Sequence, residues 1–394
     1  MKIIHYCQHV LGIGHYFRSL EIARALHRHQ VVFVTGGPSV DVDLPPHVTE
    51  YRLPGLKMDV NFSELSPTDE NRSLAGVQEE RQAILYSLFA DTVPDLFVVE
   101  LYPFGRKRFG FELLPILERL SDGNLGPAKV VCSLRDILVE KEAQPAYERR
   151  VLDLLNRYFD ALLVHADPSM ISLEETFVSA ADIRLPVVYT GFVTARPDAD
   201  AGVKLRNRLE IRDDCLLVVA SAGGGKVGAA LFRAVLDACA LMKNRSNLRF
   251  HIFTGPFMPE VDFAALSDRA ASMPGVQVAR FTQEFLSFLA AADLSISMAG
   301  YNTCMNILAA GVPALLWPFG QNREQRLRAE KLAALGDLTL IADADLKPSR
   351  LVLLMEETLK RTRGSVKPQV NLDGARETAR WLEAWCGQEE SATS

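Results

Sequence analysis

The chain has 394 residues, of which 48% are hydrophobic and 23% are charged. These fractions exclude a disordered chain, a collagen and a small disulfide-stapled protein, and the length suggests two domains. The formal net charge of -6, from 43 Lys and Arg against 49 Asp and Glu, argues against a protein that binds duplex nucleic acid.

The N-terminal segment and the cysteines indicate the cellular compartment in which the protein is expected. The apolar stretch at the start of the chain is short and is broken by His5, Gln8 and His9, so it does not resemble a signal peptide. No apolar run reaches the roughly 18 residues of a membrane span. The six cysteines lie far apart without a CxxC pair, which favours buried thiols over disulfides or a zinc site. We expect a cytoplasmic protein with at most peripheral contact with the inner face of a membrane.

Short apolar runs alternate with helical patterns along the first half of the chain. The predicted helices include residues 15–29, 79–91 and 111–120. The segment 41–71 is rich in Pro and acidic residues, and we expect it to be a surface loop. The predicted strands are residues 2–8, 31–36, 96–101, 129–134 and 161–165.

The second half repeats this alternation. Apolar runs of strand length separated by helices are typical of buried parallel strands, so two such series predict two doubly wound α/β domains. The polar stretch 194–214 is the expected boundary, and the helical pattern at 374–386 carries Trp381 and Trp385. The predicted strands are 215–221, 249–255, 276–281, 293–297 and 313–318, and the predicted helices are 227–242, 283–292, 303–310 and 323–335.

The first candidate site is the sequence GIGHYFR, residues 12–18, which follows the first strand and opens the first helix. Glycines allow a sharp turn, and a helix start offers unpaired N–H groups. The spacing is not a dinucleotide fingerprint, because the third glycine is missing. The positive end of the helix dipole favours a neutral His15 ring, which could accept a proton. The alternative is a histidine that only caps the turn.

The second candidate site is a run of three glycines, Gly223, Gly224 and Gly225, between a strand and a helix. Successive backbone N–H groups ahead of a helix form a concave site for an anion such as a diphosphate. The run is not a Walker A loop, because no GK[ST] sequence ends it. The alternative is a flexible turn.

The third candidate site combines the sequence GYNT at residues 300–303 with a later pair, Glu324 and Gln325. The glycine turn opens one helix, a buried strand follows, and the pair comes at the start of the next helix. A carboxylate beside an amide suits sugar hydroxyls, which both donate and accept hydrogen bonds. Taken alone, this pair is also ordinary capping chemistry.

These motifs, together with the aromatic and basic stretch at 102–109, resemble the GT-B glycosyltransferases. The chain is most similar to the bacterial predicted glycosyltransferases related to the MurG-type N-acetylglucosaminyltransferases of family 28. The resemblance spans most of the chain and implies two Rossmann-like domains that face each other across a cleft. It implies an acceptor-binding domain at 1–195, a nucleotide-sugar-binding domain at 205–370, and a helix at 371–388 that packs back on the first domain.

The resemblance also implies roles for single residues. His15 is the implied base, and Asp136 and Glu100 are candidates to orient it or the acceptor, with an Arg135–Asp136 capping pair as the alternative. Asn306 stands where relatives carry a Glu that grips the ribose. The implied acceptor-side residues are Gly12, Gly14, Arg18 and Glu100. The implied donor-binding residues are Gly223, Gly224 and Gly225 at the diphosphate, Gly300, Tyr301, Asn302 and Thr303 near the phosphates, Asn306 at the ribose, and Glu324 and Gln325 at the sugar hydroxyls.

Three DxD patterns, at 41–43, 198–200 and 343–345, lie in polar stretches and are expected to be solvated turns, so we expect no metal and no cofactor. The basic cluster at 106–108 could meet anionic lipid headgroups or an acceptor phosphate, or could be a solvated loop.

The expected function is inverting, metal-independent transfer of a hexosyl or N-acetylhexosaminyl group, N-acetylglucosamine among the candidates, in cell-envelope chemistry. The donor would be a UDP-sugar, and the acceptor a hydroxyl on a lipid-linked molecule or a small metabolite, with no nucleic acid as partner. Two alternatives remain open. One is a nucleotide-sugar hydrolase of the same fold, in which His15 activates water. The other is a non-catalytic nucleotide-sugar-binding relative, which the presence of Asn306 favours.

Overall fold

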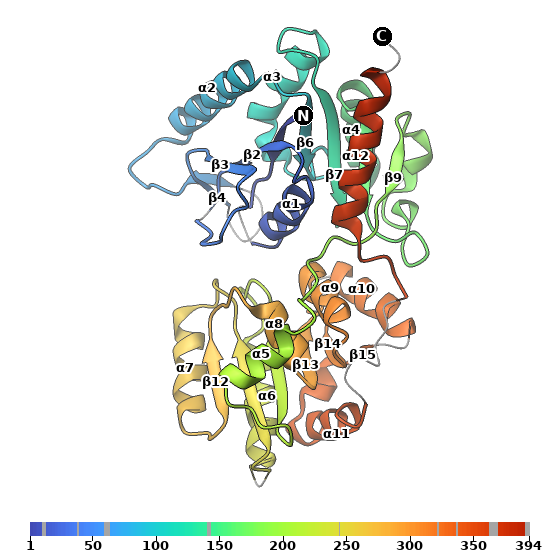
Figure 1. Cartoon of the computed structure of the whole chain (residues 1–394). Coiled ribbons are helices and arrows are strands. Elements are labelled where there is room, and N and C mark those ends of the chain that lie inside the picture. The colour runs from blue at the N-terminus through green and yellow to red at the C-terminus, as the bar shows by residue number, and fades with distance from the viewer. Residues whose placement is uncertain are drawn as a thin grey trace. The chain divides into compact units, whose positions relative to one another are not determined.

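The structure is a computed structural model that describes residues 1–9, 13–37, 39–58, 64–139, 143–243, 245–320, 323–335, 338–361 and 369–390, the last three by their backbone only. The chain forms two compact units (Figure 1). The first unit joins Met1–Val193 to Asp373–Ser394, and the second is Thr194–Leu372.

The first unit is built on a seven-stranded parallel sheet in the order β3-β2-β1-β6-β7-β8-β9. Its central strands are buried apolar runs with many β-branched residues, as expected where helices cover both faces of a sheet. A short antiparallel pair, β4 with β5, lies outside this sheet. The strands are β1 Lys2–Tyr6, β2 Gln30–Thr35, β3 Val48–Arg52, β4 Leu56–Met58, β5 Leu65–Pro67, β6 Leu96–Glu100, β7 Lys129–Arg135, β8 Ala161–His165 and β9 Val187–Tyr189.

Helices cover both faces of this sheet. On one face α1 and the C-terminal helix α12 share a core with β1, β2, β6, β7 and β8. On the other face Phe89 of α2 packs edge-on against Phe97 of β6, with ring centroids 4.8 Å apart. The helices are α1 Gly14–Ala25, α2 Leu74–Thr92, α3 Gly110–Ser121, α4 Gln144–Tyr158 and α12 Gly374–Glu390, with 3-10 turns at Lys107–Phe109, Leu173–Glu175 and Val178–Asp182.

The second unit is built on a six-stranded parallel sheet in the order β12-β11-β10-β13-β14-β15. Helices α6, α7 and α11 share a core with one face of this sheet. On the other face Phe288 of α8 packs against Phe253 of β11, and α8 contacts both α5 and α9. The strands are β10 Leu216–Ser221, β11 Leu248–Phe253, β12 Val276–Ala279, β13 Leu294–Met298, β14 Ala314–Trp317 and β15 Leu338–Leu340.

The helices of the second unit follow its strands in regular alternation. They are α5 Ala201–Arg208, α6 Ala229–Leu241, α7 Glu260–Ala271, α8 Phe285–Ala291, α9 Tyr301–Ala310, α10 Arg323–Ala334 and α11 Pro348–Thr358, with a 3-10 turn at Asp343–Leu346. Two doubly wound Rossmann-like units confirm the predicted fold class. The return of the chain end to the first unit, visible as α12 in Figure 1, is confirmed as well. Ala379 and Leu382 of α12 belong to the core that α1 shares.

The prediction of a plain surface loop at 41–71 was wrong. Strand β3 in this segment extends the first sheet beside β2, and β4 with β5 forms a hairpin. Only Val48 of β3 is buried, since an edge strand contacts the core with few residues, and so its sequence shows no apolar run. The polar stretch 194–214 also holds a helix, because α5 lies within it and packs on α8.

Both sheets reverse their strand order at one point, between β1 and β6 and between β10 and β13. Ligands of open α/β sheets bind beyond the carboxyl ends of the strands at such a point. His15 lies on the helix that follows β1, and Glu100 ends β6. The three glycines follow β10, and Gly300 follows β13. In the first unit the fold therefore brings His15 and Glu100 to the edge of the sheet at which ligands bind. In the second unit it brings the three glycines and Gly300 to the corresponding edge.

Candidate active site

The first site is a histidine–carboxylate pair at the binding edge of the first sheet. His15 is the second residue of α1, and Glu100 is the last residue of β6, the neighbour of β1. The two side chains meet with 2.6 Å between His15 Nδ1 and Glu100 Oε1. Glu100 is fully buried, whereas the His15 side chain keeps 20% of its surface exposed. The histidine is thus the part of the pair that a substrate can reach.

Two arginines surround the same carboxylate. Arg18 lies one turn after His15 on α1, so it faces the same side of the helix, and it donates to Glu100 Oε1. Arg106, from the turn that follows β6, places its Nε 4.0 Å from Glu100 Oε2. The cluster therefore joins two guanidinium groups, one carboxylate and one imidazole.

The pKa values of the pair follow from this burial and charge. Burial by itself would raise the pKa of Glu100, but the contact with His15 and the charges of Arg18 and Arg106 hold it well below its usual range. Burial lowers the pKa of His15 to about 3, with Glu100 acting in the opposite direction and Arg106 adding to the decrease. At neutral pH the pair is a carboxylate beside a neutral imidazole.

These charge states assign the tautomer of His15. An ionised carboxylate can only accept hydrogen bonds, so Nδ1 of His15 must carry the proton that it shares with Glu100. The other nitrogen of a neutral ring, Nε2, then holds a lone pair. Among the described residues, the hydrogen bond of the His15 ring is the one from Nδ1 to Glu100, and Arg18, 3.2 Å from the protonated Nδ1, is only a close neighbour of the ring. Nε2 is therefore the atom that can take a proton from a substrate.

The other residues predicted for this site have different surroundings. Asp136 is buried directly after β7, but the carboxylate in contact with His15 is that of Glu100. Gly14 is the first residue of α1. Gly12 lies outside the described residues.

The second site is the glycine-rich turn between β10 and α6. Gly223 has φ of 64° and Gly225 has φ of 85°, in the left-handed region where glycine is favoured. A side chain on Gly225 would lie 2.3 Å from the carbonyl oxygen of Thr254, so only glycine fits there. Gly224 is different: a Cβ atom on it would meet Phe257 at 3.7 Å, an ordinary contact. The turn thus presents backbone without side chains at Gly223, which is exposed, and at Gly224, which is partly exposed, as anion sites require.

The start of α9 lies beside this turn. Gly300 is the N-cap of α9 and has no side chain of its own to cap the helix, and Tyr301, Asn302 and Thr303 form the first turn. A Cβ atom on Gly223 would lie 3.6 Å from Thr303 Oγ1, which shows how close the two motifs are. A glycine-rich turn and a helix N-terminus side by side form a favourable environment for phosphate oxygens.

Asn306 is held by the first residue of its own unit. Thr194 Oγ1 donates to Asn306 Oδ1 at 2.8 Å. Thr194 directly follows the last residue of the first unit before the chain enters the second. The oxygen of Asn306 therefore has a protein partner, and a ribose hydroxyl would have to share it or replace it.

Glu324 and Gln325, at the start of α10, lie in different surroundings. Gln325 accepts a hydrogen bond at its Oε1 from the backbone N–H of Phe319, 3.1 Å away. Glu324 is partly buried beside it in the first turn of α10. On the same helix the fully buried Arg328 donates to the carbonyl oxygen of Ala299 at 3.1 Å. This bond ties α10 to the turn that opens α9.

In two of the DxD patterns, the aspartates form hydrogen bonds or ion pairs with nearby residues of the second unit. Asp343 accepts a hydrogen bond from Trp317 Nε1 at 2.8 Å, and Asp345 pairs with Arg350. Asp200 pairs with Lys204 on α5. Within the parts of the chain that the structure describes, no three His, Cys, Asp or Glu side chains gather in a group that could hold a metal ion. The helices of the same parts are all too short or too polar to cross a membrane.

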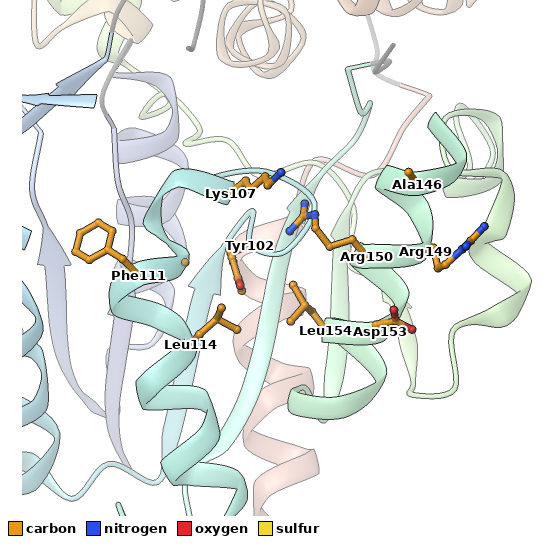
Figure 2. A pocket seen from close by; sticks show the side chains of 10 residues that line it. Tyr102, Lys107, Phe111, Leu114, Ala146, Arg149, Arg150, Asp153 and Leu154 are labelled. Atoms are coloured by element: carbon orange, nitrogen blue, oxygen red, sulfur yellow. The ribbon is translucent and has the colours of Figure 1, made fainter. Parts of the chain in front are cut away.

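The fold places the residues of the basic cluster at 106–108 in different surroundings. Arg106 turns in toward Glu100, whereas Lys107 lines a separate pocket of about 650 Å³ between α3 and α4. Figure 2 shows the Lys107 and Arg150 head groups near each other, with Tyr102, Leu114 and Leu154 below them. The pocket thus has apolar walls and a basic rim, and no motif had predicted it. It is lined by Tyr102, Lys107, Gly110, Phe111, Leu114, Ala146, Arg149, Arg150, Asp153 and Leu154.

Sequence reasoning missed two residues of these sites. Arg106 was one of three adjacent basic residues, and nothing in the cluster marks which of them turns inward. Thr194 lies 112 positions before its partner Asn306, so no local pattern links them. Glu100 was among the residues predicted to orient His15 or the acceptor; its carboxylate contacts His15, and its role stays a prediction.

Comparisons with known proteins match part of the chain to a domain family. Residues 218–369 match the model of the glycosyltransferase family 28 C-terminal domain. Over 235 residues the chain is 28% identical to a relative in Desulforudis audaxviator that is named UDP-N-acetylglucosamine--N-acetylmuramyl-(pentapeptide) pyrophosphoryl-undecaprenol N-acetylglucosamine transferase. That match covers 56% of this chain and 58% of the relative. The chain thus spans about half the length of the curated relatives that it matches.

Solved structures share the fold over nearly the whole chain. MurG of Acinetobacter baumannii superposes with a TM-score of 0.57 at 16% identity, covering 98% of this chain and 100% of that one. UDP-GlcNAc 2-epimerase of Methanocaldococcus jannaschii superposes with a TM-score of 0.59 at 12% identity, covering 98% and 99%. The turn at 223–225, the start of α9 and the pair on α10 all lie within the matched domain. The chain has the GT-B fold, and its residues 218–369 are similar to the glycosyltransferase family 28 C-terminal domain.

Proposed function

We propose that this protein is an inverting glycosyltransferase that takes its sugar from a UDP-linked donor. One observation supports the proposal above the others: the glycine-rich turn packs beside the start of α9, whose N-cap is a glycine, inside the part of the chain that matches the family 28 domain. The relatives named as N-acetylglucosamine transferases favour N-acetylglucosamine as the sugar.

In the proposed reaction His15 is the base. The acceptor hydroxyl gives its proton to Nε2 of His15 while its oxygen attacks the anomeric carbon of the donor sugar. The bond from that carbon to the diphosphate breaks, and UDP leaves with the bonding electron pair. Glu100 is a positioning residue, because it holds the proton on Nδ1 and faces the positive charge that develops on the ring.

The leaving diphosphate would be stabilised in the second unit. The N–H groups of the turn at 223–225 and of the first turn of α9 supply fixed dipoles for its growing negative charge. Glu324 and Gln325 would hold sugar hydroxyls, and Asn306 would lie toward the ribose. Because these groups replace a metal ion, no divalent cation is needed. The two units would have to bring donor and base together during turnover.

The acceptor is proposed as a hydroxyl on a lipid-linked molecule or on a small metabolite. Relatives whose names include a pyrophosphoryl-undecaprenol group favour the lipid-linked class. A cytoplasmic protein, peripheral to the inner face of the membrane, would meet both this acceptor and a soluble donor.

A panel of nucleotide sugars tested by thermal shift and calorimetry decides the donor. UDP-N-acetylglucosamine and UDP should stabilise the full chain, by roughly 2.7 kcal/mol at about 100 times the Kd. If no uridine nucleotide binds, the proposed function is wrong. Release of free sugar from the donor without any acceptor would instead identify a nucleotide-sugar hydrolase.

A non-catalytic binding protein is the second candidate, because Asn306 is already bonded to Thr194. A non-catalytic protein would bind the nucleotide sugar, but it would neither transfer the sugar to a hydroxyl acceptor nor release it as free sugar. Donor turnover measured over hours at high protein concentration separates it from a slow enzyme.

A further inference from the structure

We infer that Arg106 is a specificity-determining residue that binds an oxyanion of the acceptor, a carboxylate or a phosphate, beside His15. This inference rests on the proposed function. It assigns the acceptor a negative group near the hydroxyl that reacts.

The Nε atom of Arg106 is enclosed and forms no hydrogen bond with the described residues. The Arg106 side chain as a whole is 7% exposed. Leaving this N–H donor unpaired inside a protein is costly. Buried polar groups without a partner are rare and call for an explanation such as a ligand.

Glu100 does not meet this need. Its Oε1 is already shared by His15 and Arg18, and its Oε2 lies 4.0 Å from Arg106 Nε, beyond hydrogen-bond distance. In this cluster two guanidinium groups share one carboxylate, while His15 is neutral. The positive charge that remains favours a further anion.

The backbone of Arg106 supports a role for its side chain. Arg106 has φ of 56°, in the left-handed region that favours glycine or asparagine. An arginine there is strained, and strained residues cluster at ligand sites. Such a position is expected to hold arginine only if the side chain does something that glycine cannot.

The accessible atoms of the cluster belong to His15 and Arg106. Glu100 is fully buried and the Arg18 side chain is 2% exposed, whereas His15 and Arg106 keep 20% and 7% of their surfaces. A molecule that reaches Nε2 of His15 therefore meets Arg106 as the next charged group. The planar fork of a guanidinium matches the two oxygens of a carboxylate or a phosphate.

The experiment uses the full chain labelled with 15N-histidine, without donor. Inorganic phosphate and, separately, acetate are titrated at pH 7 and constant ionic strength, and the ring nitrogens of His15 are followed by NMR. We expect a saturable shift of the His15 signals with one or both anions. The anion that binds more tightly tells a phosphate-bearing acceptor from a carboxylate-bearing one. A parent protein that shows no saturable shift with either anion overturns the inference.

Variants locate the anion. Arg106→Gln should weaken anion binding at least tenfold, and Arg106→Lys should keep part of it. The matched control is Arg108→Gln, at an exposed position two residues away, which should leave binding unchanged. Equal binding in Arg106→Gln and the parent, or equal losses in Arg106→Gln and Arg108→Gln, would show that the site is elsewhere or unspecific.

Two further measurements separate this inference from the proposed function. The melting temperature of Arg106→Gly should equal or exceed that of the parent, because the strain is relieved, while anion binding is lost. Saturating UDP should leave the anion in place; if UDP displaces it, the anion at Arg106 belongs to the donor, and the acceptor role is wrong. Failure of UDP to bind at all would contradict the proposed function and leave the anion titration to decide the role of Arg106.

Discussion

At the scale of single residues, the chemistry of the first site depends on which nitrogen of His15 carries a proton. The contact with Glu100 holds that proton on Nδ1, and burial keeps the ring neutral. Both effects leave Nε2 with a free lone pair at neutral pH. A base that is already deprotonated needs no titration step before it acts.

Replacement of the base tests this arrangement. His15→Ala should lower turnover by about 10² to 10⁴-fold, the usual contribution of a general base. UDP binding should hardly change, because the proposed nucleotide site is built from residues of the other unit. Steady-state rates and calorimetry measure the two effects. The exposed His27 provides a matched His→Ala control, expected to have parent activity. Parent-like turnover in His15→Ala would rule out the assignment.

In the proposed nucleotide site, Asn306 would set how tightly the ribose is held. A carboxylate accepts both hydroxyls of a diol, and hydrogen bonds to a charged group contribute about 1.5 to 3 kcal/mol, against about 1 for neutral pairs. The amide of Asn306 offers one acceptor oxygen, and Thr194 already donates to it. Weak nucleotide binding is the expected consequence.

Restoring a carboxylate at this position should strengthen binding. We expect Asn306→Glu to tighten UDP binding by about 1 to 2 kcal/mol, or roughly five- to thirtyfold. Thr194→Val, which removes the donor to Asn306, is the control for a change in the local hydrogen bond alone. Unchanged affinity in calorimetry would mean that Asn306 does not face the ribose. Weaker binding with an intact fold would point to a site reshaped for another ligand.

At the scale of elements, the turn between β10 and α6 has room for substitution at only some of its glycines. Gly225 touches the backbone of the next loop, and Gly223 has a left-handed φ. Gly224 has neither restriction, so a side chain there would extend from the turn without breaking it. This makes Gly224 the position at which binding can be tested apart from folding.

Gly224→Val should abolish or strongly weaken UDP binding while the melting temperature stays within a few degrees of the parent. The matched control is Gly110→Val, since Gly110 has a similar clearance of 3.7 Å and lies in the first unit. Calorimetry and thermal melts give the two quantities. Nucleotide binding as tight as in the parent would show that the anion site is misplaced.

At the scale of the whole molecule, four histidines with lowered pKa values link stability to pH. Burial lowers the pKa of His5 and His251 to about 4, and that of His15 and His165 to about 3. In the unfolded chain each returns to about 6.5. The unfolded state therefore binds more protons below pH 6.5, and protonation favours unfolding.

The free energy of unfolding should be highest above pH 6.5 and should fall as the pH drops from 6.5 toward 4. Each of these histidines contributes up to about 1.4 kcal/mol per pH unit in that window. Urea denaturation at pH 7, 6 and 5 measures the decrease. His165→Gln, which removes one of the four groups, should flatten the slope. A free energy of unfolding that stays constant from pH 7 to pH 5 would contradict this account.

Catalysis by the whole molecule should not depend on a divalent cation. The charge of the leaving diphosphate would be met by the turn at 223–225 and by the start of α9, so activity should persist in excess EDTA. Initial rates with EDTA, and with added Mg²⁺ or Mn²⁺, test this. Complete loss in EDTA that either cation restores would assign a metal to one of the DxD patterns.

Much of the fold follows from the sequence because its signals are local. A buried parallel strand is a short apolar run, and a helix start after a glycine turn is visible in a few residues. The central strands and the helices that carry His15, Thr303 and Glu324 were therefore predictable to within a few positions. So were the two motifs that follow β1 and β10. The edge strand β3 was not, since its sequence is mostly polar.

Only the tertiary structure decided the partners of these residues. The choice of Glu100 over Asp136 beside His15 depends on which strand lies next to β1, and that order joins positions 85 residues apart. The inward turn of Arg106 depends on a left-handed backbone that no basic cluster reveals. The bond between Thr194 and Asn306 spans 112 residues. Local patterns determine the elements and where the glycine motifs lie, but contacts between distant side chains arise only when the whole core packs.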